Sequence, residues 1–240
     1  MSSASPCEWY GLQCNDQKEI IAINLDENRL KGKLPVELAS FCCLEEVNLS
    51  FNELVGVIPP QLGDLITLND DFEIEGNRLT GTIPRQLGNL KNLADDFSLA
   101  SNRLTGTIPA ELGQLTELSN DFDLSSNILV GTIPDSLGML TNLGFDNDEP
   151  HDCDFILADN RLTGTIPPSL GKLTNLDGTL SLRDLELSGT VPKELGRLTL
   201  LSVLDLRNNG HLCGVLDGEI ERINASVLIT GTSIGRPCPA

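Results

Sequence analysis

Aromatic and basic residues are scarce in this 240-residue sequence. Aromatics make up 4% of it, and 16 Lys and Arg side chains stand against 35 Asp and Glu, for a net charge of −19. Nucleic-acid binding requires a basic footprint and attachment to anionic lipid requires a polybasic segment, so this composition argues against both. Basic proteins, cations and neutral glycans remain open as partners, and acidity of this size is equally compatible with a role in solubility alone.

Long apolar runs are also missing. No stretch approaches the roughly 18 residues that cross a bilayer, so we expect no membrane insertion within this chain. The N-terminal segment MSSASPCEWYG has neither the basic start nor the apolar stretch of a signal peptide, and we expect none here.

Recognisable catalytic signatures are absent. The chain has only two histidines, His151 and His211, and neither lies beside a known Ser or Cys motif. It contains no G-x-S-x-G segment, no P-loop and no dinucleotide-binding fingerprint. These absences argue against a His-based triad, and we expect no cofactor.

An internal repeat dominates what is present. The segment L-x-G-x-I-P, with small variations, occurs seven times, and a degenerate eighth copy begins at Leu212. Its glycines lie at positions 32, 56, 81, 106, 131, 164, 189 and 214, so the steps are 24 or 25 residues except for one of 33. Such spacing identifies a repeat architecture in which each unit buries its apolar face against its neighbours.

Each unit has the same internal order. It opens with an L-x-L pair, such as Phe97 and Leu99, whose period of two places both side chains on the inner face of a strand. An Asn three residues later can hydrogen-bond the turn backbone and form an amide ladder along the stack. These residues are Asn28, Asn52, Asn77, Asn102, Asn127, Asn160 and Asn209. An L-G-x-L-x-x-L segment then closes the coil with a short helical or 3-10 turn.

The combined unit, LxxLxLxxNxLxGxIPxxLGxL, resembles the repeat of plant-type leucine-rich repeat proteins, such as receptor-like proteins, receptor kinase ectodomains and polygalacturonase-inhibiting proteins. The resemblance implies an α/β solenoid. This is a right-handed leucine-rich repeat superhelix with a parallel concave β-sheet, short helical or 3-10 turns on the convex side, and N- and C-terminal caps. We therefore divide the chain into an N-terminal cysteine cap (1–19), about eight repeats (20–212) and a C-terminal cysteine cap (213–240).

The caps carry four of the seven cysteines. The segment CEWYGLQC resembles the end of the N-terminal cap in the same family, which implies that Cys7 pairs with Cys14. Cys213 and Cys238 flank the C-terminal segment, and we expect them to form a second disulfide. Two cap disulfides suit an oxidising compartment, so we expect an extracellular or cell-surface location.

Three cysteines remain, Cys42, Cys43 and Cys153. One of the first two could pair with the N-terminal cap, and the sequence leaves that open. The H-x-C spacing of His151 and Cys153 matches no structural zinc pattern, so we expect no metal site there and a free or partly buried thiol at Cys153.

Two glycosylation sequons occur, at Asn48 and Asn224. Asn48 lies between the inward-facing residues Val47 and Leu49, so we expect its side chain to face solvent. The sequons modestly support secretion.

The concave strands are the expected ligand-binding surface, because solenoids present extended concave surfaces for binding. The solvent-facing candidates are Glu46, Asn48, Asp71, Glu73, Glu75, Asp96, Ser98, Asp121, Asp123, Asp154, Arg183 and Arg207. The middle of this surface is acidic, and its C-terminal end acquires two arginines.

An acidic column precedes the strands, formed by Glu46, Asp71, Asp96, Asp121 and Asp154. In the three units that end at Asn77, Asn102 and Asn127, one extra residue separates the last Leu of the turn from the strand. It comes with the segments NDDF, ADDF and SNDF. Carboxylates stacked about 5 Å apart repel by roughly 0.8 kcal/mol per neighbour even in bulk water, so they must stay solvated, shift their pKa values upward or hold cations. We hypothesise an electronegative edge that attracts a basic partner or weakly binds Ca²⁺. A solvated turn at the entry of each strand, with no ligand, explains the acidic residues equally well. Absence of calorimetric Ca²⁺ uptake, together with unchanged affinity after replacement of Asp71, Asp96 and Asp121 by Asn, would reject it.

Two further departures mark the later repeats. The 33-residue step contains GFDNDEPHDCDF (144–155), which resembles an EF-hand loop in composition only, because Pro150 and the missing Gly and Glu break the motif. We interpret it as an exposed acidic loop. Leu185 stands where the ladder Asn is expected, so we expect the ladder to be interrupted there.

These patterns favour a non-catalytic recognition module over an enzyme. Paired carboxylates alone leave glycosidase chemistry open, but a shallow curved sheet has no deep site that could raise the pKa of one carboxyl group. The resemblance implies a protein, peptide or glycan partner on the concave face, in a receptor ectodomain or a secreted defence-type protein. One alternative is an inhibitor of a cell-wall-degrading enzyme. The other is an ice-binding protein that uses the recurrent T-G-T segments, although these also belong to the ordinary repeat consensus.

Overall fold

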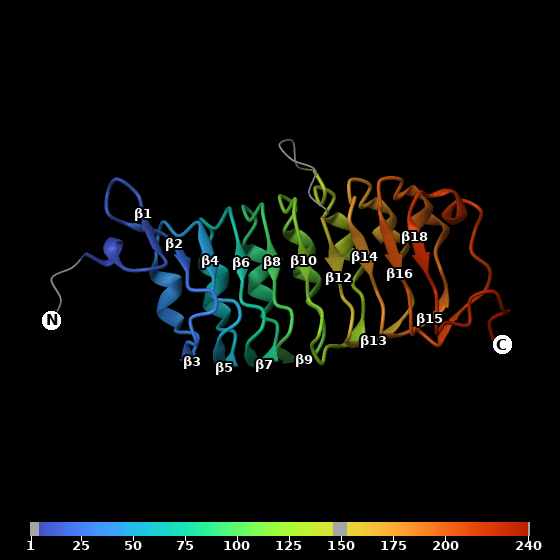
Figure 1. The fold of residues 1–240 in the computed structure, drawn as a ribbon, viewed down its shortest axis with the longest axis horizontal. Coiled ribbons are helices and arrows are strands. Elements are labelled where there is room, and N and C mark those ends of the chain that lie inside the picture. Colours follow the sequence, from blue (N-terminus) through green and yellow to red (C-terminus); the bar gives the residue numbers. More distant parts are fainter. Residues whose placement is uncertain (1–4, 146–152, 240) are drawn as a thin grey trace.

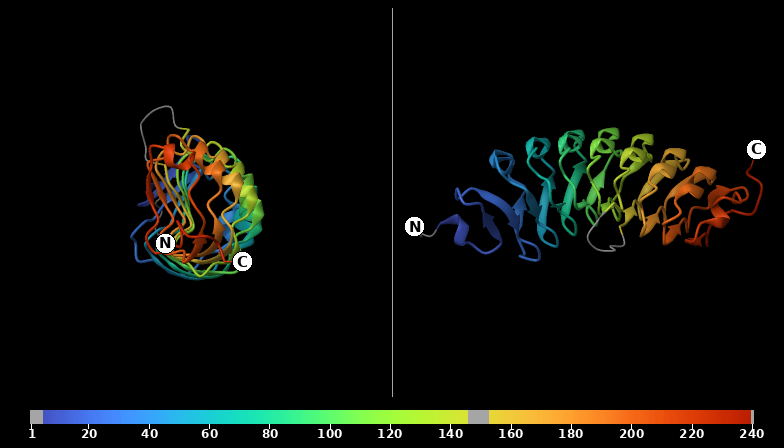
Figure 2. Two further views of the ribbon diagram at one scale, coloured as in Figure 1. Left: turned by 90° about the vertical axis from the view of Figure 1, so that its right-hand side faces the viewer. Right: turned by 90° about the horizontal axis from the view of Figure 1, so that it is seen from above.

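A computed structural model describes residues 5–145 and 153–239. The chain coils into an elongated, curved solenoid (Figure 1). Seen from above, the strands of the long sheet line the inner side of the curve and the helical turns lie on the outer side (Figure 2). The predicted solenoid, with a parallel concave sheet and convex 3-10 turns, is confirmed.

The long concave sheet takes one short strand from each successive coil. Its order is β1 (Leu12–Cys14), β2 (Ile20–Asn24), β4 (Glu46–Asn48), β6 (Phe72–Glu73), β8 (Phe97–Ser98), β10 (Phe122–Asp123), β12 (Phe155–Ile156), β14 (Thr179–Ser181), β16 (Val203–Asp205) and β18 (Ser226–Leu228). Strands β2 to β18 pair in parallel, whereas β1 of the N-terminal cap is antiparallel to β2. The sheet therefore brings residues about 25 positions apart in the sequence side by side.

Two four-stranded parallel sheets form a second side of the solenoid from the L-x-G-x-I-P segments. One contains β3 (Lys31–Lys33), β5 (Glu53–Val57), β7 (Arg78–Thr82) and β9 (Arg103–Thr105). The other contains β11 (Val130–Thr132), β13 (Arg161–Gly164), β15 (Glu186–Thr190) and β17 (His211–Cys213). They run along the lower edge in Figure 1.

The convex side consists of short 3-10 turns. They are η2 (Val36–Ser40), η3 (Pro60–Asp64), η4 (Arg85–Asn89), η5 (Ala110–Gln114), η6 (Asp135–Met139), η7 (Pro168–Lys172) and η8 (Lys193–Arg197), with η1 (Pro6–Glu8) and η9 (Ile220–Arg222) in the terminal segments. A proline, such as Pro84 before η4, precedes each of the seven repeat turns and fixes its entry angle. Neighbouring turns pack so closely that a Cβ atom on Gly88 would lie 2.2 Å from the carbonyl oxygen of Glu111, so this position requires glycine.

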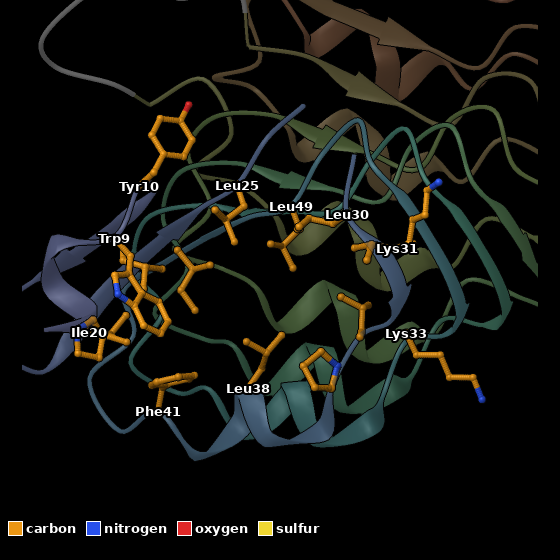
Figure 3. Close-up of a pocket in the computed structure, with 16 residues that line it drawn as sticks. Trp9, Tyr10, Ile20, Leu25, Leu30, Lys31, Lys33, Leu38, Phe41 and Leu49 are labelled. Carbon is orange, nitrogen blue, oxygen red and sulfur yellow. The ribbon is translucent and has the colours of Figure 1, made fainter. Parts of the chain in front are cut away.

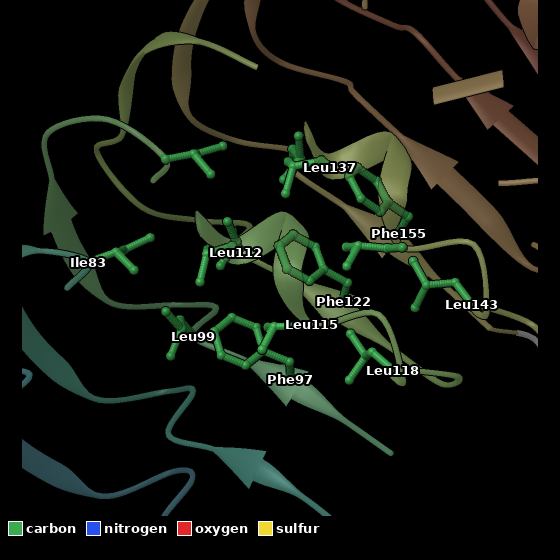
Figure 4. Close-up of a cluster of buried hydrophobic side chains, with 14 of the residues drawn as sticks. Ile83, Phe97, Leu99, Leu112, Leu115, Leu118, Phe122, Leu137, Leu143 and Phe155 are labelled. Carbon is green, nitrogen blue, oxygen red and sulfur yellow. The ribbon is translucent and has the colours of Figure 1, made fainter. Parts of the chain in front are cut away.

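The core is a continuous stack of leucines that includes four phenylalanines. Figure 4 shows three of them, Phe97, Phe122 and Phe155, packed among leucines of successive coils. Phe72, Phe97, Phe122 and Phe155 are fully buried, and the centroids of successive rings lie 5.8, 5.5 and 5.2 Å apart. Each ring occupies the first inward position of a concave strand. The offset stacking adds roughly 0.5–1.5 kcal/mol per pair beyond the burial itself.

The predicted asparagine ladder holds the coils in register. The amide of Asn102 donates to the carbonyl oxygens of Ile74, Leu99 and Ala100, and its Oδ1 accepts the N–H of Leu79. The same pattern recurs at Asn52, Asn77, Asn127, Asn160 and Asn209.

Two positions depart from this ladder. Leu185 occupies the ladder position of its coil with a buried apolar side chain, so the expected interruption is present. The prediction that Asn28 belongs to the ladder is wrong. It is exposed and donates only to the carbonyl of Asp26 two residues away, because the first coil lacks a preceding coil of the same kind to receive its amide.

Both expected cysteine pairs form disulfides. Cys7 of η1 is bonded to Cys14 of β1, and Cys213 is bonded to Cys238 across the C-terminal segment. Cys42, Cys43 and Cys153 are free, so neither Cys42 nor Cys43 pairs with the N-terminal cap.

Candidate ligand-binding surface

The acidic column forms a ladder of hydrogen bonds to the backbone. The Oδ1 atoms of Asp71, Asp96 and Asp121 accept the N–H groups of Asp96, Asp121 and Asp154 at 3.3, 2.9 and 2.7 Å. Asp154 continues the series by accepting the N–H of Thr179 at 2.6 Å. We call these four residues the aspartate ladder. The extra residue before the strands thus places a carboxylate over the entry of the next coil.

Partial burial raises the pKa values of three members of this ladder, Asp71, Asp96 and Asp121. Burial raises the pKa of Asp71 to about 7, with further upward contributions from Asp96, Asp95 and Asp70, while the hydrogen bond from the Asp96 backbone opposes the shift. Burial likewise raises the pKa of Asp121 to about 7, and the hydrogen bond from the Asp154 backbone opposes it. Of the three responses expected for stacked carboxylates, an upward pKa shift is therefore present.

A second acidic row lies on the strands themselves. The parallel register aligns Asn48 of β4 with Glu73 of β6, Ser98 of β8 and Asp123 of β10. Burial raises the pKa of Glu73 to about 8, and the charges of Asp71 and Asp96 raise it further. Burial also raises the pKa of Asp123, although Ser125 donates hydrogen bonds to its carboxylate.

Hydrogen bonds tie this row together. The amide of Asn48 donates to the carboxylate of Glu73, and the Ser98 hydroxyl donates to Oε2 of Glu75 at 2.6 Å. We call Glu73 of β6, Glu75 two residues after it and Asp123 of β10 the strand carboxylates; all three are partly exposed. Ser98 was expected to face solvent but is buried, and its hydroxyl is engaged by the carboxylate of Glu75 from the preceding coil.

The side chains at the two ends of the concave surface are less available to a ligand than the sequence indicates, because neighbouring protein groups bind them. Glu46 is partly buried and accepts a hydrogen bond from Asn24 at 3.1 Å. Arg183 forms ion pairs with Asp159 and Asp184 at 2.6 and 2.9 Å.

Arg207 contacts Asp205 through two hydrogen bonds of 2.9 and 2.6 Å. Burial alone would raise the pKa of Asp205, but the hydrogen bonds and charge of Arg207 lower it below its usual value. Both arginines are thus engaged by local carboxylates, and the free charge of the surface is acidic.

The candidate Ca²⁺ ligands lie at one end of the aspartate ladder. Carboxylate oxygens of Asp70, Asp71 and Asp95 lie within 4.8 Å of one another. One oxygen of Asp71 already accepts the N–H of Asp96. Burial raises the pKa of Asp70, and the charge of the nearby Asp95 raises it further. Weak Ca²⁺ binding therefore stays a prediction.

The two sequons differ in accessibility. Asn48 was expected to face solvent, but it is partly buried, and its amide is engaged by Glu73. Its Oδ1 accepts the N–H of Ser50, whose own side chain is buried. Asn224 is exposed, so it is the better glycan acceptor of the two.

The remaining candidate groups have local explanations. The Cys153 thiol is buried and donates to the carbonyl of Asn120 at 2.8 Å. His151 and most of the acidic insertion lie outside the described residues, so the zinc and loop interpretations stay untested. In the T-G-T segments, the hydroxyls of Thr80, Thr105 and Thr163 donate to glycine carbonyls of the preceding coil.

Known proteins share this architecture and its repeat. The family model described as Leucine Rich Repeat matches residues 43–65 and 154–173. The LRR receptor-like serine/threonine-protein kinase RGI3 of Arabidopsis thaliana is 41% identical over 69 residues, which are 28% of this chain and 6% of the kinase. The chain belongs to the leucine-rich repeat family. The matched part spans only a small fraction of this curated relative.

Solved structures extend the likeness over nearly the whole chain. The ectodomain of the Arabidopsis receptor kinase HAESA, in complex with an N-terminally extended IDA peptide hormone ligand, is 30% identical with a TM-score of 0.79. That match covers 97% of this leucine-rich repeat protein and 37% of the HAESA chain. A plant ice-binding protein has a TM-score of 0.75 over 98% of this chain and 80% of its own, but at 21% identity it shows the shared fold alone. Among the described residues, no helix has the length and apolarity to span a membrane.

Sequence reasoning identified the acidic surface but missed how it is built. The sequence predicts carboxylates that are solvated, shifted in pKa or bound to cations, and it does not indicate that each accepts a backbone N–H from the next coil. The extra residue before each of these strands was the available signal, because it changes the backbone path at the strand entry. No comparable signal indicated that Arg183 and Arg207 would be paired.

Proposed function

We propose that this leucine-rich repeat protein is a non-catalytic recognition module that binds an extracellular peptide or protein partner with basic side chains. The partner would lie across the strand carboxylates and the aspartate ladder. The carrying observation is the register that aligns Asn48, Glu73, Ser98 and Asp123 on four adjacent strands. Such a row matches cationic side chains spaced along an extended segment.

The likeness to receptor ectodomains supports the class of partner. The HAESA ectodomain is bound to a peptide hormone in its solved structure. Cap disulfides and an exposed sequon at Asn224 fit an extracellular setting. An inhibitor of a cell-wall-degrading enzyme is a narrower form of the same proposal. Inhibition of a polygalacturonase by this chain, lost when the strand carboxylates are neutralised, would support this narrower form.

The raised pKa values give the proposal a pH signature. Glu73, with a pKa of about 8, and Asp121, with a pKa of about 7, are partly protonated near neutral pH. A cation brought against them favours the ionised form, so binding should release protons and strengthen as the pH rises from 6 to 8.5. Calorimetry in buffers of different ionisation enthalpy measures the protons released.

The test uses a lysine-rich 12-residue peptide and the full chain. We expect saturable binding that weakens with salt, and at least tenfold weaker binding to the triple variant Glu73→Gln, Glu75→Gln, Asp123→Asn. The matched control is Asp64→Asn, Glu111→Gln, Asp135→Asn, which removes the same charge from the convex turns η3, η5 and η6. Equal weakening by both variants would show that only net charge matters and would overturn the proposal.

A further inference from the structure

A cluster of two thiols and one carboxylate lies where the first two coils meet. Glu19 directly precedes β2, and Cys42 and Cys43 lie in the turn between η2 and β4, the neighbouring strand of the concave sheet. The Sγ atoms of Cys42 and Cys43 lie 3.2 Å apart, and the Cys43 thiol donates to Oε2 of Glu19 at 3.3 Å. The two Sγ atoms and one carboxylate oxygen all lie within 4.8 Å of one another. The fold thus gathers three metal-ligating groups from two coils.

Packing of the core does not require sulfur at these positions. The corresponding turn residues are Lys91–Asn92 in one central coil and Thr116–Glu117 in the next, so the fold accepts ordinary polar side chains there. Cys42 is exposed, Cys43 is partly exposed, and neither forms a disulfide. The thiol pair is therefore free to serve as a ligand.

Glu19 is held in place by a turn of its own. The side chain of Asn15 donates to Oε2 of Glu19 at 2.9 Å, and its Oδ1 accepts the N–H of Glu19 at 3.0 Å. Hydrogen bonds of this kind orient the carboxylates of metal sites. Figure 3 shows Ile20, which follows Glu19, and Phe41, which precedes Cys42, among the side chains that line one pocket. Both pack against the core, which anchors the backbone on either side of the cluster.

The distances suit a tetrahedral ion with sulfur ligands. Two thiolates about 2.3 Å from Zn²⁺ lie roughly 3.8 Å apart, and a carboxylate oxygen about 2.0 Å from the ion lies roughly 3.5 Å from each of them. The two thiols would therefore have to separate by only about half an ångström.

Other uses of the thiol pair fit less well. The Cα atoms of neighbouring residues lie about 3.8 Å apart across a trans peptide, whereas disulfides usually join Cα atoms roughly 4.4–6.8 Å apart. Ca²⁺ and Mg²⁺ prefer oxygen ligands, so two thiolates disfavour both.

We propose that Glu19, Cys42 and Cys43 bind one borderline-soft divalent cation, Zn²⁺ in particular, with water as the fourth ligand. Each thiol gives its proton to solvent, and a lone pair of the resulting thiolate forms the bond to the ion. The ion joins the segment before β2 to the turn before β4, so it stabilises the N-terminal end of the solenoid. The site does not depend on the function proposed for the concave surface.

Cadmium makes the site directly measurable, because a Cd²⁺–thiolate bond gives an ultraviolet charge-transfer band and a purely carboxylate site does not. Titration of the full chain, with its cap disulfides intact and its three other thiols reduced, should show this band saturating at one Cd²⁺ per chain. Zn²⁺ should displace the Cd²⁺. Zn²⁺ alone should raise the melting temperature and slow the iodoacetamide labelling of Cys42, and a chelator should reverse both effects.

Variants locate the ligands. Cys42→Ser and Cys43→Ser should each weaken Cd²⁺ binding by roughly a hundredfold, and Glu19→Gln by roughly tenfold. The matched controls are Cys153→Ser, which removes the buried thiol, and Glu37→Gln, which removes a carboxylate from η2. Both should bind Cd²⁺ as the unmodified chain does, and circular dichroism verifies that each variant is folded.

Three results would overturn the proposal. The first is the absence of a charge-transfer band, or equal Cd²⁺ affinity in the unmodified chain and Cys42→Ser. The second is Cd²⁺ binding that is lost in Asp71→Asn instead, because the ion would then belong to the aspartate ladder. The third is recovery of a Cys42–Cys43 disulfide after the reduced chain is exposed to air in the presence of Zn²⁺.

Discussion

Single carboxylates in this protein serve two physical roles at once. Asp121 accepts the backbone N–H of Asp154, which stabilises the entry of the next coil, and it contributes to the acidic concave surface. Both roles place it in a half-buried position, where the charged form is poorly solvated and the pKa rises to about 7. Its contribution to stability therefore depends on pH.

The free energy of unfolding should fall as the pH rises from 4.5 to 8. A carboxyl group with a pKa near 4 in the unfolded chain and about 7 in the folded protein binds more protons when folded. Its stabilisation is complete below pH 4 and is lost as the pH passes through 7. Asp121→Asn should reduce this pH dependence by on the order of 1–2 kcal/mol, allowing for solvent screening. Urea denaturation at pH 5 and pH 8 measures it, with the convex Asp64→Asn as control; identical pH profiles for all three proteins would contradict this account.

The three free cysteines should react in a fixed order. Cys42 is exposed. The pKa of the Cys43 thiol is raised to about 12, first by hydrogen bonds with Cys42 and Glu19 and then by desolvation. Burial also raises the pKa of the Cys153 thiol, and Asp121 and Asp177 raise it further. Because the thiolate is the reactive form, iodoacetamide should label Cys42 first and Cys153 only after unfolding in urea. Mass spectrometry of native and denatured samples tests this order, and rapid native labelling of Cys153 would contradict its burial.

At the scale of elements, backbone register rather than side-chain charge holds the coils together. The ladder asparagines bond carbonyl and N–H groups of two successive coils, and the leucines and phenylalanines fill the space between them. A repeat depends on both features, since one coil cannot bury its apolar face alone. The same register places Glu73 and Asp123 in one row with Asn48 and Ser98.

Asn102→Ala should destabilise the protein by about 2–4 kcal/mol, because it leaves several buried backbone groups without partners. Asn28→Ala, at the exposed position outside the ladder, should cost less than about 0.5 kcal/mol. Urea denaturation of the two variants under the same conditions compares them directly. Equal losses would show that the amide ladder contributes little.

The elements follow from the sequence more completely than the site does. The spacing of glycines predicts the coils, the L-x-L pairs predict the concave strands, and Leu185 predicts the break in the ladder. The capping by Asp121 and the ion pair of Arg183 with Asp159 depend on groups in neighbouring coils, 33 and 24 residues away. Periodicity indicates which side of a strand faces outward, but it does not indicate what covers Ser98 or which groups meet across coils.

At the scale of the whole molecule, the curved solenoid separates three faces. The concave face is acidic, the convex face consists of 3-10 turns, and the lateral sheets carry the T-G-T segments. The ice-binding alternative concerns this third face. There the hydroxyls of Thr80, Thr105 and Thr163 are already bonded to glycine carbonyls, and Val130 interrupts one column.

The intact chain should therefore show no thermal hysteresis. The threonine column that precedes the repeat glycines is broken by Val130 and has its hydroxyl protons engaged by the backbone, so it is a poor match to an ordered lattice of water. Nanolitre osmometry at millimolar protein tests this, with a chain carrying Val130→Thr as comparison. Hysteresis in the unmodified chain would restore the ice-binding alternative.

The position of a bound basic peptide tests the central claim most directly. Carbodiimide couples lysine amines to carboxylates in direct contact, so a lysine-rich peptide can be mapped by mass spectrometry on the full chain. Our account predicts coupling to Glu73 of β6, to Glu75 just after that strand and to Asp123 of β10, with loss of coupling in high salt. Coupling at equal frequency to Asp64, Glu111 and Asp135 on the convex turns would contradict it.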